Sequence, residues 1–313
     1  MLNKLFNKRI KDQKAKEVMV RHVITLSPTE NLWKTQNTMS RYRIKKVVVT
    51  QNKKHPIGIV TLKDIIKFLI SDKTDRDLDE IPISEAMTTK LVIADKNGTI
   101  IECAKTMTTN NVSSLIIVED VEDDDNKNYN LAGLITSTDF ANFFSENCIG
   151  FASVKDHMSQ PIFVISIKES LSTAAQIMSD KRVSRLIVID QDNHNKLAGI
   201  ISETDVSRTI PVYKSRTIRS VYENIELLFG SKLKPDFIEP SLVRIRDIMT
   251  PNPITTEKDA DLAEAAKIMV KHGISGLPVI ESSVNVEKPI GIISKFDIIN
   301  ALSRLEGEDE LAE

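Results

Sequence analysis

The feature that most constrains the fold of this chain is a seven-residue motif that occurs four times. Each copy has a glycine, two large aliphatic residues, a serine or threonine, two variable residues and an aspartate. The copies lie at residues 58–64, 133–139, 199–205 and 291–297, and they contain four of the ten glycines of the 313-residue chain. The chain is therefore predicted to consist of one structural unit repeated four times.

Each motif ends a longer pattern that opens on a methionine, namely Met19, Met87, Met158 or Met249. An extended apolar segment follows the methionine, then apolar residues at helical spacing, and then a second extended apolar segment before the motif. In the third copy the helical spacing covers 171–178 and the second extended segment covers 186–189. The unit is predicted to be strand, helix, strand, strand, helix, which places the chain in the α/β (α+β) class.

The serine or threonine and the aspartate of the motif have two interpretations. A hydroxyl residue three positions before a carboxylate, at a junction between strand and helix, is typical of a capping box that stabilises the start of the helix. The same junction also offers backbone amides and a hydroxyl to a phosphate, and a carboxylate to both hydroxyls of a ribose. Capping would also accept glutamate, yet all four copies have aspartate. Both interpretations remain open on the residues alone.

Composition and charge favour a globular protein of the reducing cytoplasm. The net charge of −2 argues against a wholly basic nucleic-acid binder, and 41% apolar residues are enough for a sizeable core. Cys103 and Cys148 provide neither a disulfide framework nor the spacing of metal ligands. No apolar run approaches the roughly 18 residues of a membrane span. We find no phosphate-binding glycine loop and no nucleophile with a matched base, so neither an enzyme nor a metal site is expected.

The whole pattern resembles the cystathionine-β-synthase (CBS) domain family. The resemblance rests on the order of the elements, on the Gly-aliphatic-aliphatic-Ser/Thr-x-x-Asp ending and on the run Ile-Ser-Gly-Leu-Pro-Val at 274–279. It implies that the first two repeats pair into one Bateman module and the last two into a second. It also implies that clefts between paired repeats bind AMP, ADP, ATP or S-adenosylmethionine as regulatory ligands, with no tightly bound cofactor.

The predicted repeats lie at 18–72, 83–148, 154–206 and 245–305. A basic leader at 1–17 precedes them, a helical insertion at 207–244 separates the last two, and an acidic tail follows at 306–313. The leader has the pattern of a short amphipathic helix, which either packs on the first repeat or contacts a membrane or nucleic acid. The insertion is interpreted as a connector, with a docking surface for protein or nucleic acid as the alternative.

The resemblance assigns roles residue by residue. It implies that the ribose hydroxyls are bound by Asp64, Asp139, Asp205 and Asp297. It implies that the phosphates are bound by Thr61, Thr136, Ser202 and Ser294, and by the basic residues Lys63, Arg43, Lys45, Arg182, Arg185, Lys271 and Lys295. The adenine is expected to contact the backbone of Val47, Leu115, Leu186, Gly276, Leu277 and Pro278. The second repeat has no basic residue at the matching positions, so an empty site or a neutral nucleoside is expected there.

These features predict a regulatory protein that senses an adenosine-containing ligand and signals to a separate partner protein. The alternative is a scaffold of CBS repeats that binds protein or nucleic acid through its leader or insertion. An enzyme that acts on the bound nucleotide is least favoured, because the motifs provide neither a general base nor a metal. Packing of the two modules into a disc within one chain and formation of a homodimer are both compatible with the sequence.

Overall fold

The computed structural model describes residues 10–71, 74, 76–120, 129–193, 196–209, 243–283 and 286–305. Most of the predicted leader, nearly all of the insertion and the acidic tail lie outside these residues. The repeats themselves are described except for short gaps. No helix in the described part of the chain is long and apolar enough to cross a bilayer.

Each repeat contains a small sheet in which the first strand is parallel to the second and the second is antiparallel to the third. The sheets contain β1 (Thr25–Leu26), β2 (Lys46–Gln51) and β3 (His55–Thr61); β4 (Ile93–Asp95), β5 (Ser114–Asp120) and β6 (Tyr129–Thr136); β7 (Val164–Ser166), β8 (Arg185–Asp190), β9 (Lys196–Ser202) and β10 (Thr250–Pro251); and β11 (Thr256–Glu257), β12 (Gly276–Ser283) and β13 (Val286–Ser294). The predicted order of elements is confirmed in all four repeats.

Helices occupy two positions in each repeat. Those that follow the first strand are α3 (Leu32–Arg41), α6 (Ile100–Thr109), α9 (Leu171–Lys181) and α13 (Leu262–Lys271). Those that follow the motif are α4 (Leu62–Ser71), α7 (Ser137–Asn147), α10 (Glu203–Thr209) and α14 (Lys295–Ser303). Every helix of the first set is followed, within two residues, by a residue in the left-handed region, and these residues are Arg43, Asn111, Arg182 and Gly273, with φ between 50° and 65°. This backbone reverses the chain into the second strand.

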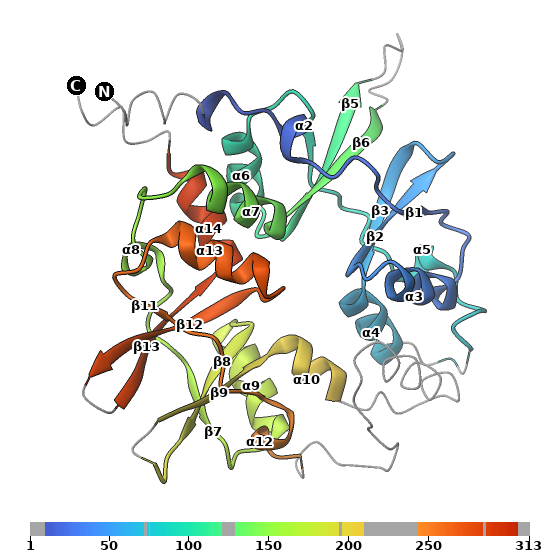
Figure 1. The fold of residues 1–313 in the computed structure, drawn as a ribbon. Helices are drawn as coiled ribbons and strands as arrows, with labels where there is room; N and C mark the ends of the chain where they lie inside the picture. The colour runs from blue at the N-terminus through green and yellow to red at the C-terminus, as the bar shows by residue number, and fades with distance from the viewer. Residues whose placement is uncertain are drawn as a thin grey trace.

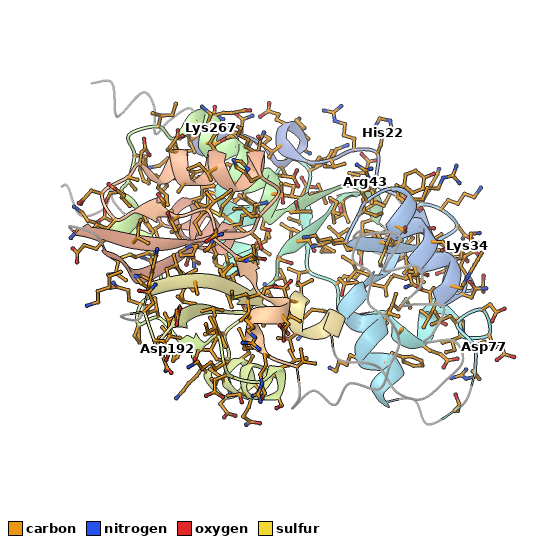
Figure 2. All side chains as sticks on the ribbon, turned by 60° about the horizontal axis from the view of Figure 1, so that its bottom comes forward. His22, Lys34, Arg43, Asp77, Asp192 and Lys267 are labelled. Carbon is orange, nitrogen blue, oxygen red and sulfur yellow. The ribbon has the colours of Figure 1, made fainter. Side chains whose placement is uncertain are left out.

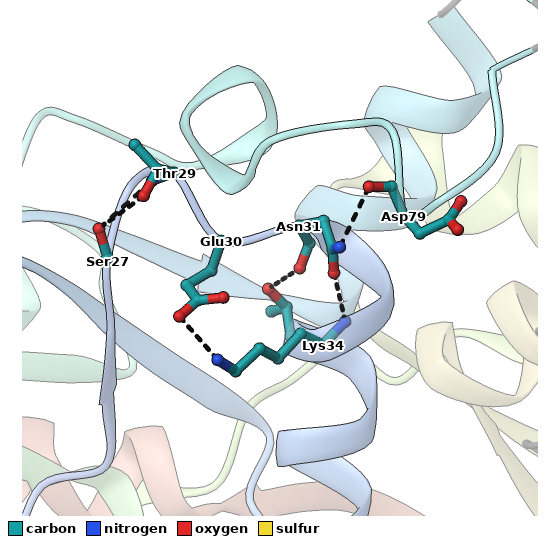
Figure 3. Close-up of polar contacts among 7 residues, drawn as sticks. Ser27, Thr29, Glu30, Asn31, Lys34 and Asp79 are labelled. Carbon is teal, nitrogen blue, oxygen red and sulfur yellow. Dashed lines mark hydrogen bonds and ion pairs between the residues drawn. The ribbon is translucent and has the colours of Figure 1, made fainter.

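A short helix before each opening methionine docks on the other repeat of its pair. These helices are α2 (Ala15–Val18), α5 (Ile83–Ala86), α8 (Val154–His157) and α12 (Ile245–Ile248). The segment leading into α5 approaches the start of α3, where the amide of Leu32 donates to the carbonyl of Ile81 at 2.9 Å. Beside it, Asn31 caps α3 and its Nδ2 donates to the carbonyl of Asp79 at 3.1 Å (Figure 3). Each repeat therefore caps the first helix of its partner, since Ile100, Leu171 and Leu262 make the same amide contact.

The opening methionine then packs against the motif glycine of the partner repeat. A Cβ atom built on Gly133 would lie 2.5 Å from the sulfur of Met19, and one built on Gly291 would lie 2.5 Å from the sulfur of Met158. Met87 stands against Gly58 and Met249 against Gly199 in the same way. Such distances leave no room for a side chain, so the glycine is needed for close approach. The opening methionine of each repeat therefore contacts the motif glycine of its partner repeat.

The two modules form a ring in which the repeats follow the order 1, 2, 4, 3 (Figure 1). Helix α7 packs against α13, and α14 packs against α6 and α7, so repeats 2 and 4 share one continuous apolar core. Repeats 1 and 3 have cores of their own. Exposed side chains such as Lys34 on α3 and Lys267 on α13 point to the outside of the molecule (Figure 2). The predicted pairing of repeats 1 with 2 and 3 with 4 is confirmed, and both modules lie within one chain.

Candidate functional site

The hydroxyl residue and the aspartate of every motif form a capping box. In each repeat the Oδ2 atom of the aspartate accepts from the backbone amide and the hydroxyl of the residue three positions earlier. The amide and hydroxyl distances are 2.8 and 2.6 Å for Thr61 with Asp64, 2.7 and 2.7 Å for Thr136 with Asp139, 2.8 and 2.6 Å for Ser202 with Asp205, and 2.7 and 2.6 Å for Ser294 with Asp297. The capping interpretation is therefore confirmed, and the cap orients one carboxylate oxygen of each aspartate.

Backbone amides at the start of these helices are already hydrogen-bonded. The amide of Ser137 donates to the carbonyl of Ser113 at 3.1 Å, and the amide of Lys295 donates to the carbonyl of Ser275 at 3.2 Å. Repeat 3 makes the equivalent bond between Glu203 and Ser184 at 2.9 Å. In these three repeats the first amide after the hydroxyl residue is thus used within the fold. A phosphate there would have to rely on other groups, such as cationic side chains.

One cation lies between the two motif aspartates of each module. Lys46 starts β2 opposite Thr61, and its Nζ atom donates to the Ser113 hydroxyl of repeat 2 at 3.4 Å. Its charge interacts with both Asp139 and Asp64. Burial of the ammonium group, opposed by these carboxylates, lowers the pKa of Lys46 to about 8.

Arg185 is the counterpart of Lys46 in the second module. It starts β8 opposite Ser202, and its Nη2 atom donates to the Ser275 hydroxyl of repeat 4 at 2.5 Å. Its guanidinium interacts with Asp297 and Asp205. Gly276 lies next to this side chain, and a Cβ atom at that position would be 3.2 Å from the carbonyl oxygen of Ile293 and 3.4 Å from the Arg185 Nε atom.

Lys295 reaches from the second module into the first. It is 5% exposed, and its Nζ atom donates to the Thr138 hydroxyl at 3.1 Å. Burial lowers the pKa of Lys295, and the nearby Lys45 lowers it further, while Asp139 opposes both effects. Repeat 2 has no cation in its own motif, but Lys46 and Lys295 supply two from other repeats. The expectation of an empty or neutral site there considered only residues close in sequence, and it stays a prediction.

The fourth motif differs from the others at its aspartate. Asp297 is 9% exposed, and its Oδ1 atom accepts from the Ser159 hydroxyl at 3.2 Å. Ser159 follows the opening methionine of repeat 3, so this bond crosses the module. Burial raises the pKa of Asp297, although hydrogen bonds from Ser294 and Ser159 act in the opposite direction. Both carboxylate oxygens of Asp297 are therefore engaged.

The sequence model of the CBS domain matches residues 15–71, 83–146, 154–212 and 245–304. The chain belongs to the CBS domain family. Among the curated CBS relatives, the uncharacterized protein MJ1225 of Methanocaldococcus jannaschii is 25% identical over 290 residues, which cover 88% of this chain and 94% of MJ1225. The uncharacterized protein MJ1426 of the same organism is 33% identical over 157 residues, which cover 48% of this chain and 90% of MJ1426.

Solved structures agree with the four-repeat CBS ring. The crystal structure of MJ1225 superposes with a TM-score of 0.67 at 23% identity, covering 92% of this chain and 99% of that one. A conserved protein of Pyrococcus horikoshii gives a TM-score of 0.60 at 17% identity, covering 93% and 100% of the two chains. At these identities the superpositions show the fold. They extend over both modules and not over a single CBS pair.

The CBS ring brings some of the predicted site residues together and leaves others apart. Lys45, Arg185 and Lys295 act electrostatically on one another or on the motif aspartates. Arg43 is exposed in the turn between α3 and β2 (Figure 2). Within the described residues, Arg43 and the exposed Arg182 and Lys271 have no hydrogen bond or ion pair with a motif aspartate, and their predicted role at the phosphates stays a prediction. Lys63 pairs with Glu203 of repeat 3 at 2.6 Å.

The residues predicted to read the adenine lie at the starts of the second strands, next to the motif across the ladder. Val47 faces Val60, Leu115 faces Ile135, Leu186 faces Ile201, and Gly276, Leu277 and Pro278 face Ser294, Ile293 and Ile292. Sequence reasoning missed four polar residues that join the repeats at the site, namely Ser113, Thr138, Ser159 and Ser275. Lys46 occupies the position in repeat 1 that Arg185 has in repeat 3.

Proposed function

We propose that this chain is a regulatory protein that binds adenosine-containing ligands at its Ser/Thr-x-x-Asp motifs and signals to a separate partner. One observation carries the proposal. The Oδ1 atoms of Asp64 and Asp139 accept no hydrogen bond from the described residues, while Oδ2 of each is held by the cap. A carboxylate fixed in this way is suited to accept hydrogen bonds from the hydroxyls of a ribose.

The charges near Asp139 favour AMP, ADP or ATP over S-adenosylmethionine. Lys46 and Lys295 both interact with this aspartate, and neither forms an ion pair within the described residues. A phosphate would gain charge-assisted hydrogen bonds from them. The sulfonium of S-adenosylmethionine carries a positive charge and would be repelled by the same groups.

Neither cysteine of the chain is suited to nucleophilic catalysis. Burial raises the pKa of both Cys103 and Cys148 to about 12, so neither thiol is a nucleophile near neutral pH. The described residues contain no group of three His, Cys, Asp or Glu side chains that could hold a metal ion. The alternative scaffold function concerns the leader and the insertion, which lie largely outside the described residues, and it stays a prediction.

Replacing Asp139 by alanine is expected to weaken AMP binding by at least about tenfold, because the ribose loses its charged acceptor. The substitution also removes a helix cap, which costs about 0.5–2 kcal/mol of stability. Glu102→Ala is the matched control, since Glu102 caps α6 with Thr99 outside any motif. Isothermal titration calorimetry should show weakened binding for Asp139→Ala and unchanged binding for Glu102→Ala. Unchanged AMP binding in both Asp139→Ala and Asp64→Ala would contradict the proposal.

The affinity for AMP is expected to fall as the pH rises through the pKa of Lys46. The charged groups that face Lys46 are Asp139, Lys45 and Asp64, and burial leaves its pKa at about 8. A lowered pKa means that the free protein loses this cation above about pH 8, so AMP should bind about tenfold more weakly at about pH 9 than at about pH 7. Adenosine has no phosphate and should show no such loss. Lys46→Arg should abolish the pH dependence, and persistence of the same dependence in that variant would refute the role of Lys46.

A further inference from the structure

The modules meet on two sides of the ring, and the two sides are built differently. On one side α7 packs against α13, and α14 packs against α6 and α7, within one continuous apolar core. On the other side α4 faces α10 (Figure 1), and the cores of repeats 1 and 3 stay separate. Within the described residues, neither α3 nor α4 packs on α9 or α10 in this way. Lys63 and Glu203 form an ion pair between these repeats, but both side chains are open to solvent and such pairs contribute little stability.

The second position of α3, α6, α9 and α13 shows which face of each helix meets the other module. The first position is buried in all four helices, so it faces the sheet of its own repeat. The second position is buried only where the modules share a core, with Ile101 and Ala263 at 0% and 2% exposed. In α9 it holds the exposed Ser172, and in α3 it holds Trp33, which is 49% exposed. Trp33 therefore lies on the face of α3 that a helix of the other module would cover.

Gln36 lies one turn further along the same face of α3. Its equivalents, Ala104 in α6 and Ala266 in α13, are fully buried in the shared core. Gln36 is 4% exposed, yet its side-chain amide forms no hydrogen bond with the described residues. Buried amides in folded proteins are nearly always hydrogen-bonded. We call Trp33 and Gln36 the α3 face, and an occupant of this face should bring both apolar surface and a polar group.

The chain between repeats 3 and 4 leaves and returns on the side of the ring where the α3 face lies. The structure describes α10 as far as Thr209, and the first residue of this helix already contacts repeat 1. The chain returns at Val243, whose carbonyl accepts from the amide of Leu171 at the start of α9 at 2.9 Å. Residues 210–221 can span up to about 40 Å when extended, so the residues beyond them can reach α3.

One part of this connection has the sequence of an amphipathic helix. The run 222–229 has apolar residues at positions 222, 225, 228 and 229, which fall on one face of a helix. Gly230 follows, as is typical of a helix end. A helix this short is not stable alone, and it depends on packing of its apolar face against the rest of the fold.

We propose that residues 222–229 form a helix that packs on the α3 face of repeat 1, covers Trp33 and supplies a polar partner to Gln36. This helix replaces, between repeats 1 and 3, the direct packing that joins repeats 2 and 4. It therefore connects the two modules on the side of the ring where their own helices do not pack closely. None of this depends on a bound nucleotide.

The fluorescence of Trp33 tests the proposal, because Trp33 is the only tryptophan in the chain. Ile225→Gln places an amide on the apolar face of the segment and should expose Trp33. Acrylamide quenching should then rise at least about twofold, since the ring is only half exposed in the fold. Leu227→Gln is the matched control, because Leu227 lies about 160° away from Ile225 around a helix. It should leave the quenching unchanged.

The reciprocal measurement follows the segment instead of the tryptophan. In the full-length wild-type chain, hydrogen exchange in 222–229 should be at least about tenfold slower than in a free peptide of the same sequence. Trp33→Gln should remove most of this protection. Ile149→Gln is the control, since Ile149 is a large apolar residue that is 72% exposed in the connection between the modules, outside the α3 face. It should leave the protection intact.

Three results would overturn the proposal. The first is exchange in 222–229 of the wild-type chain as fast as in the free peptide. The second is quenching of Trp33 that Ile225→Gln leaves unchanged. The third is quenching that rises when a dimer dissociates on dilution, because a second copy of the chain would then cover Trp33. Melting temperatures identify a variant that is unfolded, and the comparison of the wild-type chain with the peptide needs no variant.

Discussion

Replacing Phe144 by alanine is expected to destabilise the chain by about 3–5 kcal/mol and to loosen two repeats at once. Phe144 lies on α7 with no exposed surface, in the apolar core shared by repeats 2 and 4. The cavity would therefore open in the core that α7 shares with α13 and α14. Urea unfolding measures the loss of stability. Hydrogen exchange should become faster in α13 and α14 as well as in α6 and α7.

Leu32→Ala is the matched control for this prediction. Leu32 is also fully buried, but its core belongs to repeat 1 and the segment that docks on it. The substitution should cost about 2–5 kcal/mol and leave exchange in α13 and α14 unchanged. If Phe144→Ala also left exchange in these helices unchanged, repeats 2 and 4 would not share a core in solution.

Replacing Gly133 by alanine is expected to destabilise the first module by about 1–3 kcal/mol, through overpacking of the contact between its repeats. The new Cβ atom would lie 2.5 Å from the sulfur of Met19 and 2.9 Å from the carbonyl oxygen of Val20. The sulfur belongs to a flexible side chain, but the carbonyl of Val20 accepts from the amide of Leu134 in an isolated bridge to β6 and cannot move without disturbing that bridge. Thermal unfolding measures the loss of stability. Faster proteolysis in the segment 72–82, which connects repeats 1 and 2, would indicate that the two repeats separate.

Gly291→Ala tests the equivalent contact of the second module, where the new Cβ atom would clash only with a side chain. The three atoms nearest to the Cβ position at Gly291 all belong to Met158, and the closest is the sulfur at 2.5 Å. The loss should be smaller than for Gly133→Ala, and Met158→Ala should restore part of it, because the remaining Cβ lies 3.3 Å away. An equal loss at both glycines, without rescue, would show that the close approach to backbone is not what matters at Gly133.

The local features of the fold were predictable from the sequence. The spacing of apolar residues around Met178 and the run at 186–189 were enough to place α9 and β8. Ser202 and Asp205 predicted the capping box that starts α10, because a cap depends on residues three positions apart. The likeness among the four copies added the pairing of neighbouring repeats.

The site was only partly predictable, because its charges come from distant parts of the chain. Asp139 was identified from its motif, and Lys295 was predicted to hold a phosphate in its own repeat. The contact of Lys295 with Thr138 of repeat 2 was not predicted, because it spans 157 positions. Arg43 and Arg182 were also predicted to hold phosphates, and only the structure showed that both occupy exposed left-handed turns after α3 and α9. The hydrogen bond that Ser159 donates to the second carboxylate oxygen of Asp297 was also not predictable, because the two residues are 138 positions apart in the sequence.

The sequence by itself therefore determined the repeating unit, its strands and helices, and the hydroxyl and aspartate at each helix start. These follow from local spacing and short-range hydrogen bonds, which act along the chain. Only the tertiary structure decided that Met19 packs on Gly133, that repeats 2 and 4 share a core, and that Lys295 stands beside Asp139. The physical reason is that steric fit and charge depend on distance in space, and the ring brings residues together whose separation in sequence gives no sign of it.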